Sequence, residues 1–159
     1  MNLFVYGPLF FPEVWRLITP KRFIMVNAML DGYACLRITG RHTPALVPLS
    51  SAVTDGFIYK EIDDSIIDRT DDFLGPIYQR QNVSVRMENG EVVPAMTYVL
   101  HVKNIGLALK YRWSAEAFRR NHLQEYLKSR QDFYMPDSPS AHQAATTTGA
   151  KNASNGRKR

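Results

Sequence analysis

The 159-residue sequence has one cysteine and no long apolar segment. A single Cys35 excludes an internal disulfide framework and a cysteine-based zinc cluster, and its place in an apolar stretch is typical of a buried strand residue. The longest apolar runs, at residues 3–6 and 23–26, have the length of a strand, and the N-terminus lacks the basic and apolar regions of a signal peptide. We therefore expect a soluble, cytoplasmic protein with no membrane partner.

The sequence also lacks the motifs of most enzyme classes. It has no nucleophile elbow, no phosphate-binding glycine loop and no dinucleotide fingerprint, so we expect no cofactor. Its four histidines are not spaced as metal ligands, and no metal site is expected; they are His42, His101, His122 and His142.

A net charge of +5 would suggest nucleic-acid binding if it were spread over a folded surface. Four basic residues and one acidic residue lie between Asp137 and Arg159, which leaves 16 basic and 14 acidic residues in the rest of the chain. The same segment is rich in Ser, Ala, Thr and Asn, and no large apolar residue follows Met135. The pattern predicts one domain at residues 1–136 and a disordered basic tail at 137–159. Four charges give weak, salt-sensitive binding, so a nucleic-acid partner is not expected.

Hydrophobic patterning predicts mostly strands in the domain. Apolar runs indicate strands at residues 3–6, 23–28, 33–38 and 57–62, with the second and third joined through Asp31-Gly32. Pro12 is suited to the first turn of a brief helix, and Asp63 is suited to capping another.

The second half of the domain contains the clearest local signal. Val83, Val85 and Met87 alternate with polar residues, Asn89-Gly90 supplies a turn, and residues 92–100 return as the partner strand. Ser114 then predicts the start of a helix that runs to about residue 130. Strands with interspersed helices and no regular βαβ rhythm favour an α+β fold with a mostly antiparallel, barrel-like sheet.

A glycine loop follows the first predicted strand. The turn at Tyr6-Gly7-Pro8-Leu9 leaves backbone amides unpaired, and such amides can hold a carboxylate or a developing oxyanion. A Gly-Pro pair can equally do no more than turn the chain.

The interpretation of this loop depends on a second stretch later in the chain, Phe73-Leu74-Gly75-Pro76-Ile77-Tyr78-Gln79-Arg80. Together the two stretches resemble the gamma-glutamylcyclotransferase-like, or AIG2-like, family, which has a Tyr-Gly-(Ser/Thr)-Leu loop and a Phe-Glu-Gly-x-x-Tyr-x-Arg stretch. The resemblance extends from residue 3 to about residue 127. It implies a small mixed barrel flanked by short helices and a C-terminal helix. It also implies a reaction in which loop amides hold a gamma-glutamyl group while the glutamate deprotonates the α-amine, which attacks the γ-carbonyl and releases 5-oxoproline.

Two departures from the family pattern put this reaction in question. Leu74 stands where the family has its general base, and Pro8 removes a hydroxyl and a backbone N–H. The resemblance then implies a catalytically silent or repurposed protein that binds a small acid or amide ligand. The substrate-binding residues it implies are Tyr6, Gly7, Pro8, Leu9 and Tyr78.

An alternative remains open at this stage. An active cyclotransferase, acting as an acyltransferase or lyase on gamma-glutamyl amines or peptides, could use Glu61, Asp71 or Asp72 as its base. Tyr78 and Arg80 are also open: they are pocket-wall and ligand contacts if the family geometry holds, and otherwise alternating residues of a strand edge.

Overall fold

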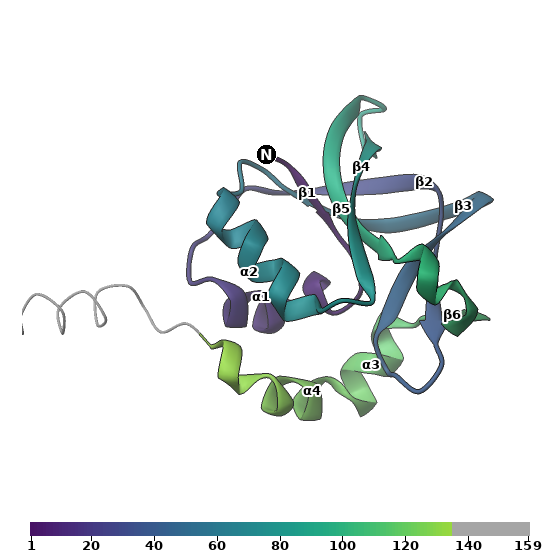
Figure 1. Ribbon diagram of the computed structural model, residues 1–159. Coiled ribbons are helices and arrows are strands. Elements are labelled where there is room, and N and C mark those ends of the chain that lie inside the picture. The colour runs from purple at the N-terminus through teal and green to yellow at the C-terminus, as the bar shows by residue number, and fades with distance from the viewer. Residues whose placement is uncertain (135–159) are drawn as a thin grey trace, which may run out of the picture.

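The computed structural model describes residues 1–134 and shows a closed five-stranded barrel. Figure 1 shows the barrel strands β1 (Leu3–Val5), β2 (Met25–Ile38), β3 (Pro44–Tyr59), β4 (Tyr78–Met87) and β5 (Val92–Leu100). β1 pairs antiparallel with β3 and parallel with β5, while β3–β2, β2–β4 and β4–β5 are antiparallel. The prediction of a mixed, mostly antiparallel barrel in an α+β fold is confirmed. The tail predicted at 137–159 lies outside the described residues.

Helices and short 3₁₀ turns flank this barrel. The helices are α1 (Pro12–Ile18), α2 (Asp64–Leu74), α3 (Ala115–Asn121) and α4 (Leu123–Ser129), and the 3₁₀ turns are η1 (Gly7–Phe10), η2 (Val102–Leu107) and η3 (Gln131–Phe133). α1 and α2 lie beside one another, and α3 and α4 run below them in Figure 1. Within residues 1–134, no helix combines the length and the apolar character needed to cross a bilayer.

The first strand separates two parts of the core. Because side chains alternate along a strand, Leu3 and Val5 pack with the helices, while Phe4 packs inside the barrel with Leu46 and Val99. All three β1 side chains are fully buried. β1 therefore fixes the helical layer against the barrel, and the loop after it starts from a rigid base.

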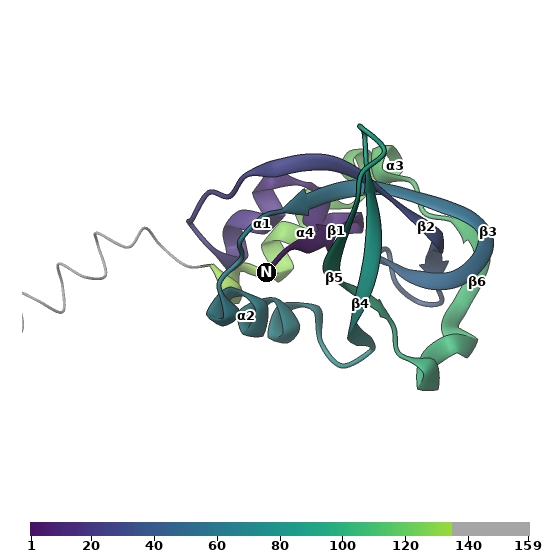
Figure 2. The ribbon, with the colours of Figure 1, turned by 90° about the horizontal axis from the view of Figure 1, so that it is seen from above.

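The region from 23 to 59 differs from the sequence prediction. Instead of two strands joined by a turn at Asp31-Gly32, β2 is one continuous strand, and its register shifts between Asp31 and Tyr33. Gly32 has φ of 84°, a conformation that glycine adopts without strain, so the residue makes a bulge rather than a turn. The partner strand β3 begins at Pro44, well before the predicted strand at 57–62. Figure 2 shows the two long strands curving together across the barrel.

The last predicted helix is two helices. Ser114 does cap α3, since its hydroxyl accepts a hydrogen bond from the Ala117 amide at 3.1 Å, but the chain leaves helical geometry at His122 before α4 starts. Phe118 and Leu123 are buried on either side of this break. An additional strand, β6 (Ala108–Arg112), pairs with the end of β2 and was not predicted. After the break, Phe73 of α2 packs against Tyr126 of α4 and Phe133 of η3.

Candidate functional site

The glycine loop after β1 forms the 3₁₀ turn η1. Gly7 has φ of 60°, and a Cβ atom at this position would lie 2.9 Å from Cγ of Pro44, so only glycine fits without movement. Pro8 occupies the first turn of η1, where a backbone N–H has no partner within the helix in any case. The proline is therefore compatible with the turn, although it removes one amide that a ligand could use.

The side chains of Tyr6 and Leu9 have structural roles. The Tyr6 hydroxyl donates to the Tyr98 carbonyl at 2.6 Å and accepts from the Leu46 amide at 3.3 Å, and burial raises the pKa of Tyr6. Leu9 is 4% exposed and belongs to the core between β1 and the helices. Contact of Leu9 with a ligand is thus limited to its backbone, and the predicted ligand-binding role of these residues stays a prediction.

Leu74 is the last residue of α2. Gly75, with φ of 84°, ends the helix, and its amide donates to the Asp71 carbonyl at 2.9 Å. The half-buried Leu74 side chain lines a cavity of about 70 Å³, which we call the Leu74 cavity. Its other lining residues are Pro8, Arg41, Thr43, Phe73, Tyr78, Tyr126 and Arg130. The fold thus brings Pro8, Leu74 and Tyr78 together, and no carboxylate is among the lining residues.

Tyr78 lies at the start of β4, and its hydroxyl is already used as a donor. It donates to the Pro44 carbonyl at 2.6 Å, and burial raises the pKa of Tyr78. With its hydrogen committed, the phenolic oxygen can act only as an acceptor, and a hydrogen bond from the Thr43 side chain lowers the Tyr78 pKa against the larger rise due to burial.

Two arginines border the Leu74 cavity. Arg130 donates to the carbonyl of Phe73, in the last turn of α2, and its guanidinium carbon lies 4.4 Å from the centroid of the Phe73 ring. Arg41 lies on the exposed turn between β2 and β3. Burial raises the pKa of Tyr126, and the charges of Arg130 and Arg41 both oppose this rise. Both positive charges therefore act on the same corner of the cavity.

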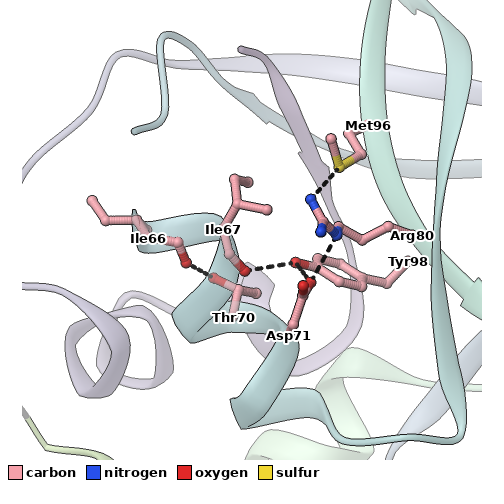
Figure 3. Close-up of polar contacts among 7 residues, drawn as sticks. All are labelled: Ile66, Ile67, Thr70, Asp71, Arg80, Met96 and Tyr98. Carbon is pink, nitrogen blue, oxygen red and sulfur yellow. Dashed lines mark hydrogen bonds and ion pairs between the residues drawn. The ribbon is translucent and has the colours of Figure 1, made fainter. Parts of the chain in front are cut away.

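A second cavity, of about 450 Å³, contains the acidic residues, and we call it the Asp71 cavity. Asp71, Asp72, Tyr78, Arg80 and Tyr98 are among its lining residues. Figure 3 shows Oδ1 of Asp71 accepting from the Tyr98 hydroxyl at 2.7 Å and lying 3.1 Å from Nε of Arg80. Burial, followed by the bond to Asp71, raises the pKa of Tyr98. Arg80, which the sequence left open, therefore pairs with Asp71 and does not line the Leu74 cavity.

The remaining candidates lie elsewhere. Glu61 is exposed just after β3, with φ of 58°. Tyr6 and Gly7 line a third cavity of about 270 Å³ together with Cys35, which is half-buried rather than buried. Burial raises the pKa of the Cys35 thiol to about 12, so it is not a nucleophile at neutral pH. Within residues 1–134, no three His, Cys, Asp or Glu side chains are grouped to hold a metal ion.

Sequence reasoning missed three of the cavity residues entirely, namely Arg41, Thr43 and Arg130. They come from the β2–β3 turn and from the residue after α4, so they meet Leu74 only through long-range packing. Tyr126 falls within the helix predicted to start at Ser114, and a helical pattern does not reveal that this residue also lines the cavity.

Solved structures share this barrel and its flanking helices. A structure described as a gamma-glutamyl cyclotransferase superposes with a TM-score of 0.58 at 16% identity, covering 87% of this chain and 89% of the other, which shows the fold. A solution structure of an Arabidopsis thaliana protein gives a TM-score of 0.63 at 27% identity, covering 82% of this chain and 79% of the other.

The same relationship holds in sequence. The profile of the family described as "Gamma-glutamyl cyclotransferase, AIG2-like" matches residues 3–116, and the chain belongs to this family. Protein AIG2 C of Arabidopsis thaliana is 30% identical over 129 residues, which cover 80% of this chain and 78% of that protein. The resemblance inferred from the two motifs is thereby confirmed.

Proposed function

We propose that this chain is a catalytically silent or repurposed member of its family that binds a small acid or amide ligand in the Leu74 cavity. The observation that carries the proposal is the lining of that cavity, in which an aliphatic side chain holds the family's general-base position and no carboxylate stands beside it. A base must lie within hydrogen-bonding reach of the proton that it removes.

The expected loss of rate is large. The family reaction needs the α-amine of the substrate in its neutral, nucleophilic form, and a hydrocarbon side chain accepts no proton. Removing a positioned general base typically costs a factor of about 10² to 10⁴ in rate. Positioning of the substrate would remain, but positioning alone does not supply the proton transfer.

The cavity retains groups suited to an amide or an acid. The Tyr78 oxygen, whose hydrogen is directed to Pro44, can accept from an amide N–H of a ligand. The turn at Gly7 has backbone amides suited to a carboxylate, with one donor fewer because of Pro8, but of this turn only Pro8 lines the Leu74 cavity. We therefore propose that this site retains ligand binding although it has lost catalysis. We propose the cytoplasm as the location.

The alternative function, cyclotransferase activity through another acid, is less well supported. Of the acids considered, Asp71 and Asp72 line the Asp71 cavity and not the Leu74 cavity. The oxygen Oδ1 of Asp71 is also engaged by Tyr98 and Arg80. A substrate would have to occupy the Asp71 cavity to be deprotonated there.

A proton NMR time course tests the proposal. The protein is incubated with glutathione, gamma-glutamyl-lysine and gamma-glutamyl-alanine, and 5-oxoproline is followed. We expect no product above the rate without protein. In parallel, methyl-labelled protein is titrated with small carboxylic acids and amides, and the Leu74 methyl resonances should shift.

Two results would contradict the proposal. Product that grows in proportion to protein would establish a hidden base, and Asp71→Asn, Asp72→Asn and Glu61→Gln would then locate it. Absence of any Leu74 shift across the ligand set would remove the binding function.

A further inference from the structure

The Leu74 cavity has an unusual charge for a site whose family position is acidic. Two of its lining side chains are guanidinium groups, and none is a carboxylate. The end of α2 contributes a partial negative charge of roughly half a unit, which two full positive charges outweigh. The local potential therefore favours an anion.

Arg130 is held in place and still has a free donor. Its guanidinium stacks on the rings of Phe73 and Phe133, with centroid distances of 4.4 and 4.8 Å, and one Nη donates to the Phe73 carbonyl. Its Nε is buried and has no hydrogen-bond partner among residues 1–134. Because Nε is closed off from solvent, a ligand oxygen would have to bind the N–H groups of the two Nη atoms that the bond to Phe73 leaves over.

Arg41 is free to complete such a contact. It is exposed on the β2–β3 turn, and within the described part of the chain it makes no ion pair. Its charge reaches both Tyr78 and Tyr126, because Arg41 lowers the pKa of each against the larger rise due to burial. The two arginines thus reach the cavity from distant parts of the sequence.

We propose that the Leu74 cavity selects carboxylates that carry no ammonium group beside the carboxylate, and that Arg41 and Arg130 hold the carboxylate. This inference rests on the proposed binding function and adds the chemical class of the ligand. An ammonium group would face two like charges and the Leu74 methyl groups, with no lining carboxylate to pair with it. Arginine, in contrast, is well matched to a carboxylate in both charge and geometry.

The size of the cavity limits how much of the ligand it encloses. Its volume of about 70 Å³ is much smaller than the 450 Å³ of the Asp71 cavity, so it encloses the carboxylate end of a ligand rather than the whole molecule. The rest of a longer ligand extends outwards.

A matched ligand pair tests the selectivity directly. Glutamine and the monoamide of glutaric acid share a carboxylate, a side-chain-like amide and the same chain length, and they differ only in the α-ammonium group. Isothermal titration calorimetry with the full chain should give at least tenfold tighter binding of the monoamide. Titration of methyl-labelled protein should move the Leu74 methyl resonances, which places the ligand in this cavity.

A matched pair of variants tests the arginines. Arg41→Gln removes an exposed charge at the cavity and should weaken binding of the monoamide by about tenfold, the usual scale for one charge-assisted hydrogen bond. Arg22→Gln removes an exposed charge from a residue that does not line this cavity and should leave the affinity unchanged. Arg130→Gln should weaken binding at least as much, with circular dichroism confirming that it folds.

The outcomes separate this inference from the proposed function. Equal affinity for glutamine and the monoamide, with the Leu74 shifts present, overturns the selectivity and leaves the binding function in place. Affinity that is insensitive to both arginine variants also overturns it. If neither ligand nor any other acid or amide shifts the Leu74 resonances, both proposals fail together.

Discussion

The Leu74 cavity and the Asp71 cavity are neighbours with opposite chemistry. Both take residues from the last turn of α2, and Tyr78 lines both. The first has two arginines and no acid, whereas the second has two acids and one arginine. Asp71 therefore lies three residues from Leu74, the position that we propose for the family's base, but its Oδ1 atom is bound to Tyr98 and Arg80. Proximity in sequence does not place a carboxylate in the site.

The comparison also shows which features of the family site are structural. Gly7 is required by its backbone angle and by the proximity of Pro44, and the Tyr6 hydroxyl ties the loop to Leu46 and Tyr98. These constraints hold whether or not a reaction takes place. The loop conformation is therefore fixed by these contacts, and the proposed binding function needs no catalytic base to maintain it.

The largest expected effect comes from restoring the acid. Leu74→Glu places a carboxylate at the end of α2 and should raise 5-oxoproline release from gamma-glutamyl-alanine by about a hundredfold over the unmodified protein, the lower end of the range for a general base. The lower end applies because Pro8 still deletes a loop donor. The release is measured by proton NMR.

The control for this variant is Leu74→Gln. Glutamine has the shape of glutamate but is not a base, so it should give no product. A rise with Leu74→Gln, or no rise with Leu74→Glu in a folded protein that still binds the monoamide, would break the assignment of the Leu74 cavity as the old reaction site.

A smaller effect is expected from the glycine that supports the cavity. Gly7→Ala combines a left-handed residue, which costs about 1–2 kcal/mol, with a Cβ contact that forces Pro44 to move, so we expect a loss of about 2–4 kcal/mol in the free energy of unfolding. Gly40 also has a positive φ, of 75°, but nothing lies within 4 Å of its Cβ position. Urea denaturation of Gly40→Ala should therefore show only about 1 kcal/mol. Equal losses would contradict the packing argument at Pro44.

Removing the charge of Asp71, in the Asp71 cavity, should have a smaller effect on the free energy of unfolding. Asp71→Asn weakens the pairing with Arg80 and Tyr98, and because the two charged side chains are 34% and 40% exposed we expect only about 1 kcal/mol in urea denaturation. Asp72→Asn, at an exposed neighbouring position, should cost close to nothing. Binding of the monoamide should be unchanged in both variants. A loss of affinity in Asp71→Asn would mean that the two cavities act as one site.

Local signals in the sequence predicted much of the fold. The Asn89-Gly90 hairpin, the start of α3 at Ser114 and the short first strand depend on nearby residues, and all were found. The continuity of β2 was not predictable in this way, because a glycine such as Gly32 suits a β-bulge as well as a turn. Only pairing with the long strand β3 decides between the two.

The residues of the Leu74 cavity likewise divide into those that local sequence signals could predict and those that they could not. Leu74, Pro8 and Tyr78, which line one cavity, could be singled out from the sequence because they occupy motif positions with fixed spacing, and their role in binding stays a prediction. Arg41 and Arg130 could not be singled out, because they reach the cavity from a turn and a helix end that no periodicity connects. The positive charge of the Leu74 cavity thus comes from the residues that sequence patterns describe least well.

The smallest predicted effect concerns alkaline pH. Burial, followed by the bond to Asp71, holds the pKa of Tyr98 above the unfolded value of about 10, so the folded protein keeps this proton while the unfolded chain loses it. The resulting stabilisation is complete below about pH 10 and declines as the pH rises above it, by about 0.8 kcal/mol for one tyrosine at pH 10.5. Tyr98→Phe should therefore show a smaller alkaline loss than the unmodified protein in urea denaturation at pH 8 and pH 10.5. Tyr126→Phe in the Leu74 cavity should show the same reduction, since burial raises the pKa of Tyr126 too.

At pH 8 the Tyr98→Phe and Tyr126→Phe variants should differ in stability, because the Tyr98 hydroxyl donates to Asp71 and that of Tyr126 has no bonded partner among residues 1–134. If Tyr126→Phe is as costly as Tyr98→Phe at pH 8, the Leu74 cavity contains a hydrogen bond in solution that would compete with a ligand.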